Sequence, residues 1–140
     1  MATVACSNNN TNNILNEAYF AYLLQAAFLQ DPKALTLETL MEMVTQNGHE
    51  IVGTKGSGGI AKGSRADLLL WSLKEPAFVP VPYGKFDAAL IYNAPDIKPH
   101  TVILDGDIVV DAYKFKGLDE NEVCRAANRC GARVYHFMNS

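Results

Sequence analysis

The fold of this chain is decided by residues 59–71, which read GIAKGSRADLLLW, and by residues 102–110, which read VILDGDIVV. The first segment passes from a glycine-rich loop into a continuous apolar run, a pattern that indicates a core strand. The second holds two apolar runs around Asp105-Gly106, a pair that tolerates positive φ at a tight turn. We therefore expect a strand over Asp67–Ser72 and a β-hairpin over Thr101–Asp111.

Apolar spacing and capping residues predict two helices in the N-terminal part of the chain. The first is expected from Asn13 to Leu29 and is apolar nearly all round, because Glu17 is its one charged residue. A helix of that kind belongs inside a larger body. The second is expected to begin after the N-cap Thr36 and to be interrupted at Asn47-Gly48.

Two further helices are expected toward the C-terminus. A short one should span Phe86 to Tyr92, with Ala89 and Leu90 facing inward. The last should start at the capping motif Asp119-x-x-Glu122 and run to about Cys130, with Gly131 as its stop. Three prolines are expected to hold the chain extended after the predicted strand, because proline fixes φ and disfavours helix before it: Pro76, Pro80 and Pro82.

Composition limits the classes of protein to which the chain can belong. The chain has 140 residues, of which 49% are apolar and 19% charged, against about 25% charged in an average soluble domain. This excess of apolar residues indicates surface meant for burial against something else. With a net charge of −3 and no stripe of lysine and arginine, we expect no nucleic-acid partner. We also expect no membrane span and no signal peptide, and therefore a cytoplasmic location.

The three cysteines are an odd number without the spacing of a disulfide framework, so reduced thiols are expected: Cys6, Cys124 and Cys130. Cys124, Cys130 and His136 are weighed as zinc ligands. However, two cysteines six residues apart on a helix point about 240° apart. A structural role for both thiols is the favoured interpretation.

Two other motif-based alternatives are weaker still. Residues 56–61, GSGGIA, fit a dinucleotide-binding fingerprint by letters. They follow a predicted helix and open a strand, whereas that fingerprint must follow a strand and open a helix. Cys6-Ser7 with His49 is considered as a nucleophile pair, but no orienting carboxylate accompanies it.

The order of these pieces resembles the C-terminal third of the amidohydrolase superfamily. The similar branch holds chlorohydrolases and N-heterocycle deaminases, including guanine, S-adenosylhomocysteine and methylthioadenosine deaminases. Besides the two opening segments, residues 37–48, LETLMEMVTQNG, resemble a helix of that family. The resemblance covers roughly Ser7 through Val123, and its structural motif residues are Gly63, Ala66, Asp67, Asp105 and Gly106. In this family Asp67 is expected to tie neighbouring turns to the entry of its strand.

The resemblance implies an α+β fold: helices from the end of a (β/α)₈ barrel, plus a small β-unit of a composite β-domain. The implied segments are 1–58, which is helical, 59–117, the β-unit with the hairpin 101–111, and 118–140, the C-terminal helix and tail. They are expected to form one compact unit overall.

The same resemblance indicates that the chemistry lies elsewhere. In such enzymes an H-x-H pair, two later histidines and an Asp at the end of the eighth strand hold zinc or iron, which activates a water molecule. That Asp is expected four or five residues before Ser7, where Ala2 and Thr3 stand. The chain has no H-x-H, and its histidines match no ligand position of the family: His49, His100 and His136. We therefore expect no catalytic residue, no metal site and no cofactor in this chain.

Ser7 and Asn8 have a weak claim as substrate-loop residues, because their counterparts lie at the mouth of the barrel; a solvated N-terminus is the alternative. Three hypotheses remain. The chain is the C-terminal part of a metal-dependent hydrolase and inert alone, or an interaction module that completes a separate barrel-bearing chain. The third, an independent enzyme, has no constellation of residues to support it. Exposed strand edges and an apolar helix face predict self-association, in the form of a dimer.

Overall fold

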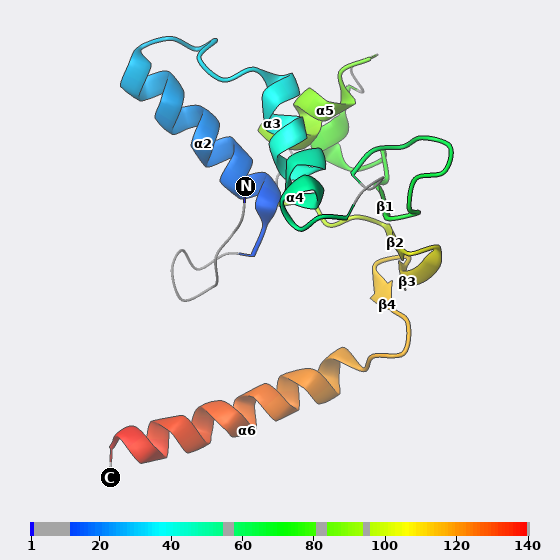
Figure 1. Ribbon diagram of the computed structural model, residues 1–140. Coiled ribbons are helices and arrows are strands. Elements are labelled where there is room, and N and C mark those ends of the chain that lie inside the picture. The colour runs from blue at the N-terminus through cyan, green and yellow to red at the C-terminus, as the bar shows by residue number, and fades with distance from the viewer. Residues whose placement is uncertain (2–11, 55–57, 81–83, 94–95, 140) are drawn as a thin grey trace.

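The computed structural model describes residues 1, 12–54, 58–80, 84–93 and 96–139 (Figure 1). The fold is α+β, as expected from the sequence, with helices gathered beside a small antiparallel sheet. The helices are α2 (Ile14–Leu29), α3 (Leu37–Val44), α4 (Gln46–Ile51), α5 (Phe86–Ala88) and α6 (Glu120–Met138), with a 3₁₀ turn η1 (Pro76–Phe78) and a π-type turn η2 (Ala89–Asn93). The strands are β1 (Leu68–Leu70), β2 (Thr101–Leu104), β3 (Asp107–Asp111) and β4 (Lys114–Phe115).

The sheet is an antiparallel meander in the order β1-β2-β3-β4. The predicted hairpin is confirmed: β2 pairs with β3, and Asp105 and Gly106 at its turn have φ of 53° and 88°. Positive φ at both central residues is the geometry that matches the twist of two paired strands. The predicted first strand is confirmed but is shorter than 67–72, because pairing with β2 runs only from Leu68 to Leu70. The strand β4 was not predicted.

The N-terminal helices begin where their caps predict. The Asn13 side chain accepts a hydrogen bond from the Leu15 amide, and the Thr36 hydroxyl accepts one from the Thr39 amide. The predicted interruption at Asn47-Gly48 is wrong, because both residues lie within α4. The break falls earlier, at Thr45, whose hydroxyl donates to the Met41 carbonyl over 2.6 Å and competes with the helical hydrogen bonds there.

The core consists of two small clusters that meet at η2. The first holds Phe78, Ala89 and Leu90, and the second holds Ala18, Leu40 and Ile91. Leu15 of α2 packs against both clusters. The predicted inward orientation of Ala89 and Leu90 is confirmed. The proline-rich segment was expected to be extended. Glu75 and Val79 are extended, but the turn η1 forms between them at Pro76 and places Phe78 in the core, while Pro82 lies outside the described residues.

The sequence predicts that Trp71, Phe78, Tyr83, Phe86 and Tyr92 fill the core of the β-unit, but the structure divides those it describes between the two clusters. Phe86 lies 6.4 Å from Trp71 and 5.3 Å from Phe78, measured between ring centroids. Tyr92 instead packs against α2, with its ring centroid 5.1 Å from that of Tyr22 and the two rings tilted by 54°. Tyr92 follows Ile91 in η2, and both side chains therefore pack with the cluster formed by α2 and α3. Tyr83 lies outside the described residues.

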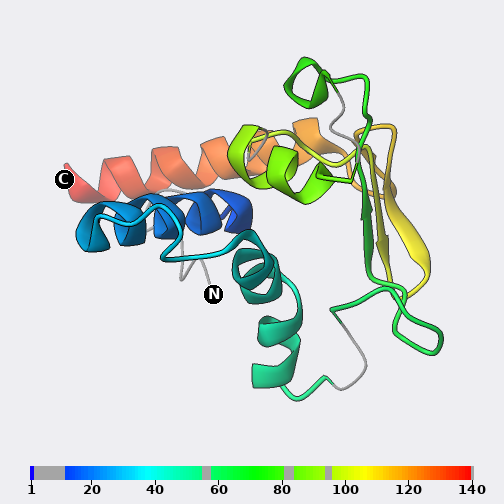
Figure 2. The same cartoon turned by 90° about the horizontal axis from the view of Figure 1, so that it is seen from above.

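The C-terminal helix α6 begins on the side of the sheet and extends away from it (Figures 1 and 2). Its N-cap prediction is confirmed, since the Asp119 carboxylate accepts from the Asn121 amide. The predicted stop at Gly131 is wrong, because the helix continues to Met138. One glycine inside a helix costs only about 1 kcal/mol, and good helix formers on both sides outweigh it. The division into 1–58, 59–117 and 118–140 stays a prediction; α6 contributes no buried residue to the core.

Truncation of the core at η2 tests the packing. Ile91 is fully buried, whereas Ile60 is 93% exposed, so the same substitution at the two sites separates burial from chemistry. We expect Ile91→Ala to lower the free energy of unfolding by about 2–5 kcal/mol and Ile60→Ala to leave it nearly unchanged. Urea denaturation followed by circular dichroism measures both. Equal losses at the two positions would contradict the assignment of the core.

Candidate functional site

The motif residues gather where β1 begins and the β2–β3 turn folds back. The Asp67 carboxylate accepts a hydrogen bond from the Asp105 amide over 2.7 Å. Next to it, the Gly106 amide donates to the Ala66 carbonyl over 3.1 Å. The Arg65 guanidinium lies between two carboxylates, 3.2 Å from that of Asp67 and 3.3 Å from that of Asp105. We call this group, Arg65, Ala66, Asp67, Asp105 and Gly106, the turn clamp.

The turn clamp has the chemistry of a structural site. The Asp67 side chain is 21% exposed, and both of its oxygens are engaged, one by a backbone amide and one by Arg65. A carboxylate held in this way ties the turn to the strand entry. Gly63 precedes the clamp at a φ of 86°, a conformation that glycine adopts without steric cost.

The three histidines lie on separate elements and do not converge. In α4, His49 Nδ1 lies 3.0 Å from the Thr54 hydroxyl, and before β2, His100 Nδ1 lies 2.9 Å from the Thr101 hydroxyl. His136 lies in the last turns of α6. Among the residues that the structure describes, no group of three His, Cys, Asp or Glu could hold a metal ion. The described donor set therefore does not fit the zinc or iron that the resemblance implies. Ser7 and Asn8, the predicted substrate-loop residues, lie outside the described residues, as does Cys6.

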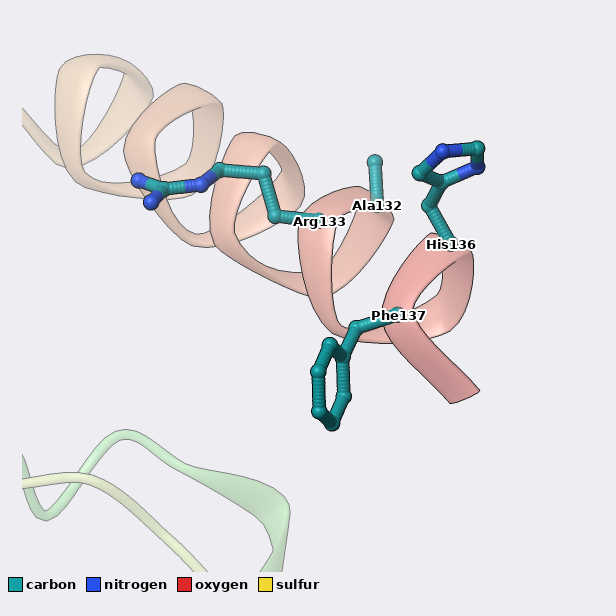
Figure 3. Close-up of a pocket in the computed structure, with 4 residues that line it drawn as sticks. All are labelled: Ala132, Arg133, His136 and Phe137. Carbon is teal, nitrogen blue, oxygen red and sulfur yellow. The ribbon is translucent and has the colours of Figure 1, made fainter. Parts of the chain in front are cut away.

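Figure 3 shows a hollow on α6, lined by Ala132, Arg133, His136 and Phe137. All four residues come from consecutive turns of one helix, and the close-up shows their side chains spreading outward in different directions. A binding site normally has convergent polar groups from several elements around an apolar pocket. This hollow is the exposed flank of α6 and defines no ligand site.

Two tyrosines outside the turn clamp, Tyr92 and Tyr113, have displaced pKa values. The Tyr113 hydroxyl donates to the Glu75 carboxylate over 2.8 Å, and this hydrogen bond raises the pKa of Tyr113, with a smaller effect of burial. Burial raises the pKa of Tyr92, with Tyr22 and Asp87 adding to it. Tyr113 and Glu75 are 38 residues apart in sequence, so no local sequence spacing could have indicated their contact.

Among the residues that the structure describes, one buried side-chain polar atom has no hydrogen-bond partner. Trp71 Nε1 is buried and makes no hydrogen bond to the described residues. Trp71 follows β1 and packs against the cluster of Phe78, Ala89 and Leu90, so its indole acts there as an apolar wall. A buried N–H donor without a hydrogen bond costs free energy, so the Trp71 indole destabilises this part of the core to that extent.

The chain folds as an α+β unit in which the turn clamp ties the β2–β3 turn to the start of β1. The amidohydrolase family profile matches residues 1–109, and the chain belongs to that family. Within the described residues, no helix is long and apolar enough to cross a bilayer.

Individual relatives show the same relationship. The chain is 32% identical to a 5-methylthioadenosine/S-adenosylhomocysteine deaminase of Desulforudis audaxviator, over 96% of this chain and 31% of the relative. It is 30% identical to a 5'-deoxyadenosine deaminase of Methanosarcina mazei, over 100% of this chain and 32% of the relative. The chain thus spans just under a third of the length of these relatives.

Solved structures agree with this fold. A zinc-bound adenosine deaminase from Xanthomonas campestris superposes with a TM-score of 0.87 at 23% identity, over 94% of this chain and 30% of that chain. A zinc-bound atrazine chlorohydrolase from Arthrobacter aurescens superposes with a TM-score of 0.79 at 21% identity, over 89% of this chain and 28% of that chain.

The structural role of the turn clamp is tested by Asp67→Ala. This substitution removes the acceptor of the Asp105 amide and one of the two carboxylates beside Arg65, and we expect it to lower the free energy of unfolding by about 1–2 kcal/mol. Asp107→Ala removes an exposed carboxylate directly after the same turn, at the first residue of β3, and should cost about 0.5 kcal/mol or less. Urea denaturation measures the free energy of unfolding of both variants. A clamp variant as stable as the Asp107 variant would show that Asp67 does not hold the turn.

Proposed function

We propose that this chain forms the structural end of a metal-dependent hydrolase that deaminates or dechlorinates N-heterocycles, and that it is inactive by itself. The observation that carries the proposal is the match of residues 1–109 to the amidohydrolase family. The carboxylate of Asp67 in that match is engaged by the Asp105 amide and by Arg65. The names of the relatives, deaminases of adenine nucleosides and a chlorohydrolase of a triazine, supply the class of substrate.

In this proposal the helical part, α2 to α4, is the last portion of a barrel, and β1 to β4 belong to a composite β-unit. The turn clamp fixes the sheet, and the two core clusters hold the sheet to the helices. Because the described residues do not fit a metal, no catalytic step is assigned to them. Cys124 and Cys130 are free and exposed, and a reducing, cytoplasmic location is part of the proposal.

The alternative function is that of a subunit that completes a separate barrel-bearing chain. The observation in its favour is the amount of apolar side chain left exposed on α2 and α6, including Leu24 at 68% and Val134 at 57%. A neighbouring reading frame that encodes an H-x-H pair, and whose product co-purifies with this chain, would favour the subunit. A frame interrupted by a stop or frameshift would favour a remnant of a single enzyme.

Activity and metal content test the proposal together. The purified chain should release no ammonia from S-adenosylhomocysteine or 5'-methylthioadenosine and no chloride from atrazine, and elemental analysis should find no stoichiometric zinc or iron. A chimaera in which this chain replaces the matched segment of the Desulforudis deaminase should release ammonia from S-adenosylhomocysteine. Turnover by the chain alone, or stoichiometric metal in it, would contradict the proposal. A folded, zinc-loaded chimaera without activity would contradict the substrate class.

A further inference from the structure

The β2–β3 turn contains a dipeptide whose two residues can react with each other. In an Asp-Gly pair the backbone nitrogen of the glycine can attack the side-chain carboxyl carbon of the aspartate. Glycine favours this attack because it has no Cβ to crowd the nitrogen. Asp105-Gly106 is the one Asp-Gly pair in the sequence, and the Asp105 side chain is 74% exposed. Water therefore reaches the carboxyl group at which such a reaction would take place.

The reaction needs only water as a co-reactant. Gly106 N forms a bond to Asp105 Cγ, and the bond from Cγ to one carboxyl oxygen breaks. That oxygen leaves as water with the proton of the carboxyl group and the proton of the amide, which gives a five-membered succinimide ring. A water molecule then adds to the main-chain carbonyl carbon of Asp105 and breaks its bond to Gly106 N. The product is isoaspartate, in which the main chain passes through the side chain of residue 105 at unchanged mass.

The folded turn holds the attacking nitrogen away from this reaction. The Gly106 amide donates its hydrogen to the Ala66 carbonyl over 3.1 Å, and an amide nitrogen attacks only after it has lost that hydrogen. The N–H bond lies in the plane of the peptide group, so the same hydrogen bond fixes the orientation of the plane. With φ of 53° at Asp105 and 88° at Gly106, the plane turns toward Ala66. The nitrogen must leave this carbonyl before it can approach Cγ.

The carboxyl group is held from the other side. Arg65 Nε lies 3.3 Å from Asp105 Oδ1 and 3.2 Å from Asp67 Oδ2. The backbone amide of Asp105 donates to Asp67 Oδ1 over 2.7 Å. Both reacting groups are thus tied to the residues that lead into β1. Formation of the ring requires rotation within Asp105, and this rotation breaks those contacts.

We propose that Asp105-Gly106 is an isoaspartate-forming modification site and that the turn clamp protects it. The pair reacts from the fraction of molecules in which the turn has detached from Ala66, Asp67 and Arg65, so the rate follows the free energy of that local opening. Isoaspartate lengthens the main chain by one atom between Leu104 and Asp107, which pair across the turn. The modified turn therefore cannot return to the same register. This proposal concerns the chemical lifetime of the fold and goes beyond the proposed function.

Incubation of the purified chain at neutral pH tests the proposal. After protease digestion, chromatography separates the aspartate and isoaspartate forms of the peptide that contains residue 105, and mass spectrometry verifies that their masses are equal. Deamidation at Asn47-Gly48 changes the mass and is assigned to another peptide. We expect the chain in concentrated guanidinium chloride to form isoaspartate faster than the folded chain. Asp67→Ala should raise the rate in the folded chain about 5–30-fold, because the detached turn gains what the clamp loses.

Two variants serve as matched controls. Ile91→Val lowers the stability of the whole fold by an amount comparable to Asp67→Ala, but Ile91 lies in the core cluster of Ala18 and Leu40. It should change the rate less than about twofold, because the turn opens locally. Asp107→Ala removes a carboxylate directly after the same turn and should also stay within about twofold.

Several results would overturn the proposal. One is a folded chain that reacts as fast as the denatured chain, or a denatured chain that forms no isoaspartate. Another is a rate in Asp67→Ala no higher than in Asp107→Ala. Equal acceleration by Ile91→Val and Asp67→Ala would show that global unfolding exposes the pair. If Asp67→Ala does not fold by circular dichroism, Arg65→Ala takes its place with an expected increase of about two- to fivefold, and a rate equal to that of Asp107→Ala overturns the proposal.

Discussion

Two adjacent side chains in η2, Leu90 and Ile91, connect the helices to the sheet. Leu90 packs with Phe78 and the Trp71 wall, while Ile91 packs with Ala18 of α2 and Leu40 of α3. Three consecutive residues, Ala89, Leu90 and Ile91, thus supply buried side chains to both clusters. Because the described core is small and divided, the position of each cluster depends on this segment. A rigid interior transmits a displacement at one point to its neighbours, so the orientation of the sheet relative to α2 is fixed at η2.

The turn clamp holds the sheet together, just as η2 holds the sheet and the helices together. The strands are short, and β1 and β4 are its two edges. Short antiparallel strands gain little stability from pairing alone. The Asp67 carboxylate adds a hydrogen bond across 38 residues of sequence, and Arg65 spans the two carboxylates that face it. The motif that points to the family thus holds the β2–β3 turn against the start of β1.

The same physical constraint accounts for the surface. A small core leaves apolar side chains of α2 and α6 in water, where each costs free energy until something covers it. The apolar excess in the composition indicated such a surface before any fold was known. Its distribution over two helices far apart in sequence could not be derived from composition, because that depends on which face of α2 the clusters of Leu40 and Ile91 occupy.

The sequence by itself determined the local elements whose signals are local: the caps of Asn13, Thr36 and Asp119, the turn at Asp105-Gly106, and the apolar run of β1. It also determined the family, through motifs in their order. Only the tertiary structure decided that α6 continues past Gly131, that the break before α4 falls at Thr45, and that Tyr92 faces α2. A single glycine costs less than a helix gains from its neighbours, and a tyrosine turns toward whichever cluster its element meets. Such outcomes depend on small free-energy differences between distant contacts, and neighbouring residues in the sequence do not encode them.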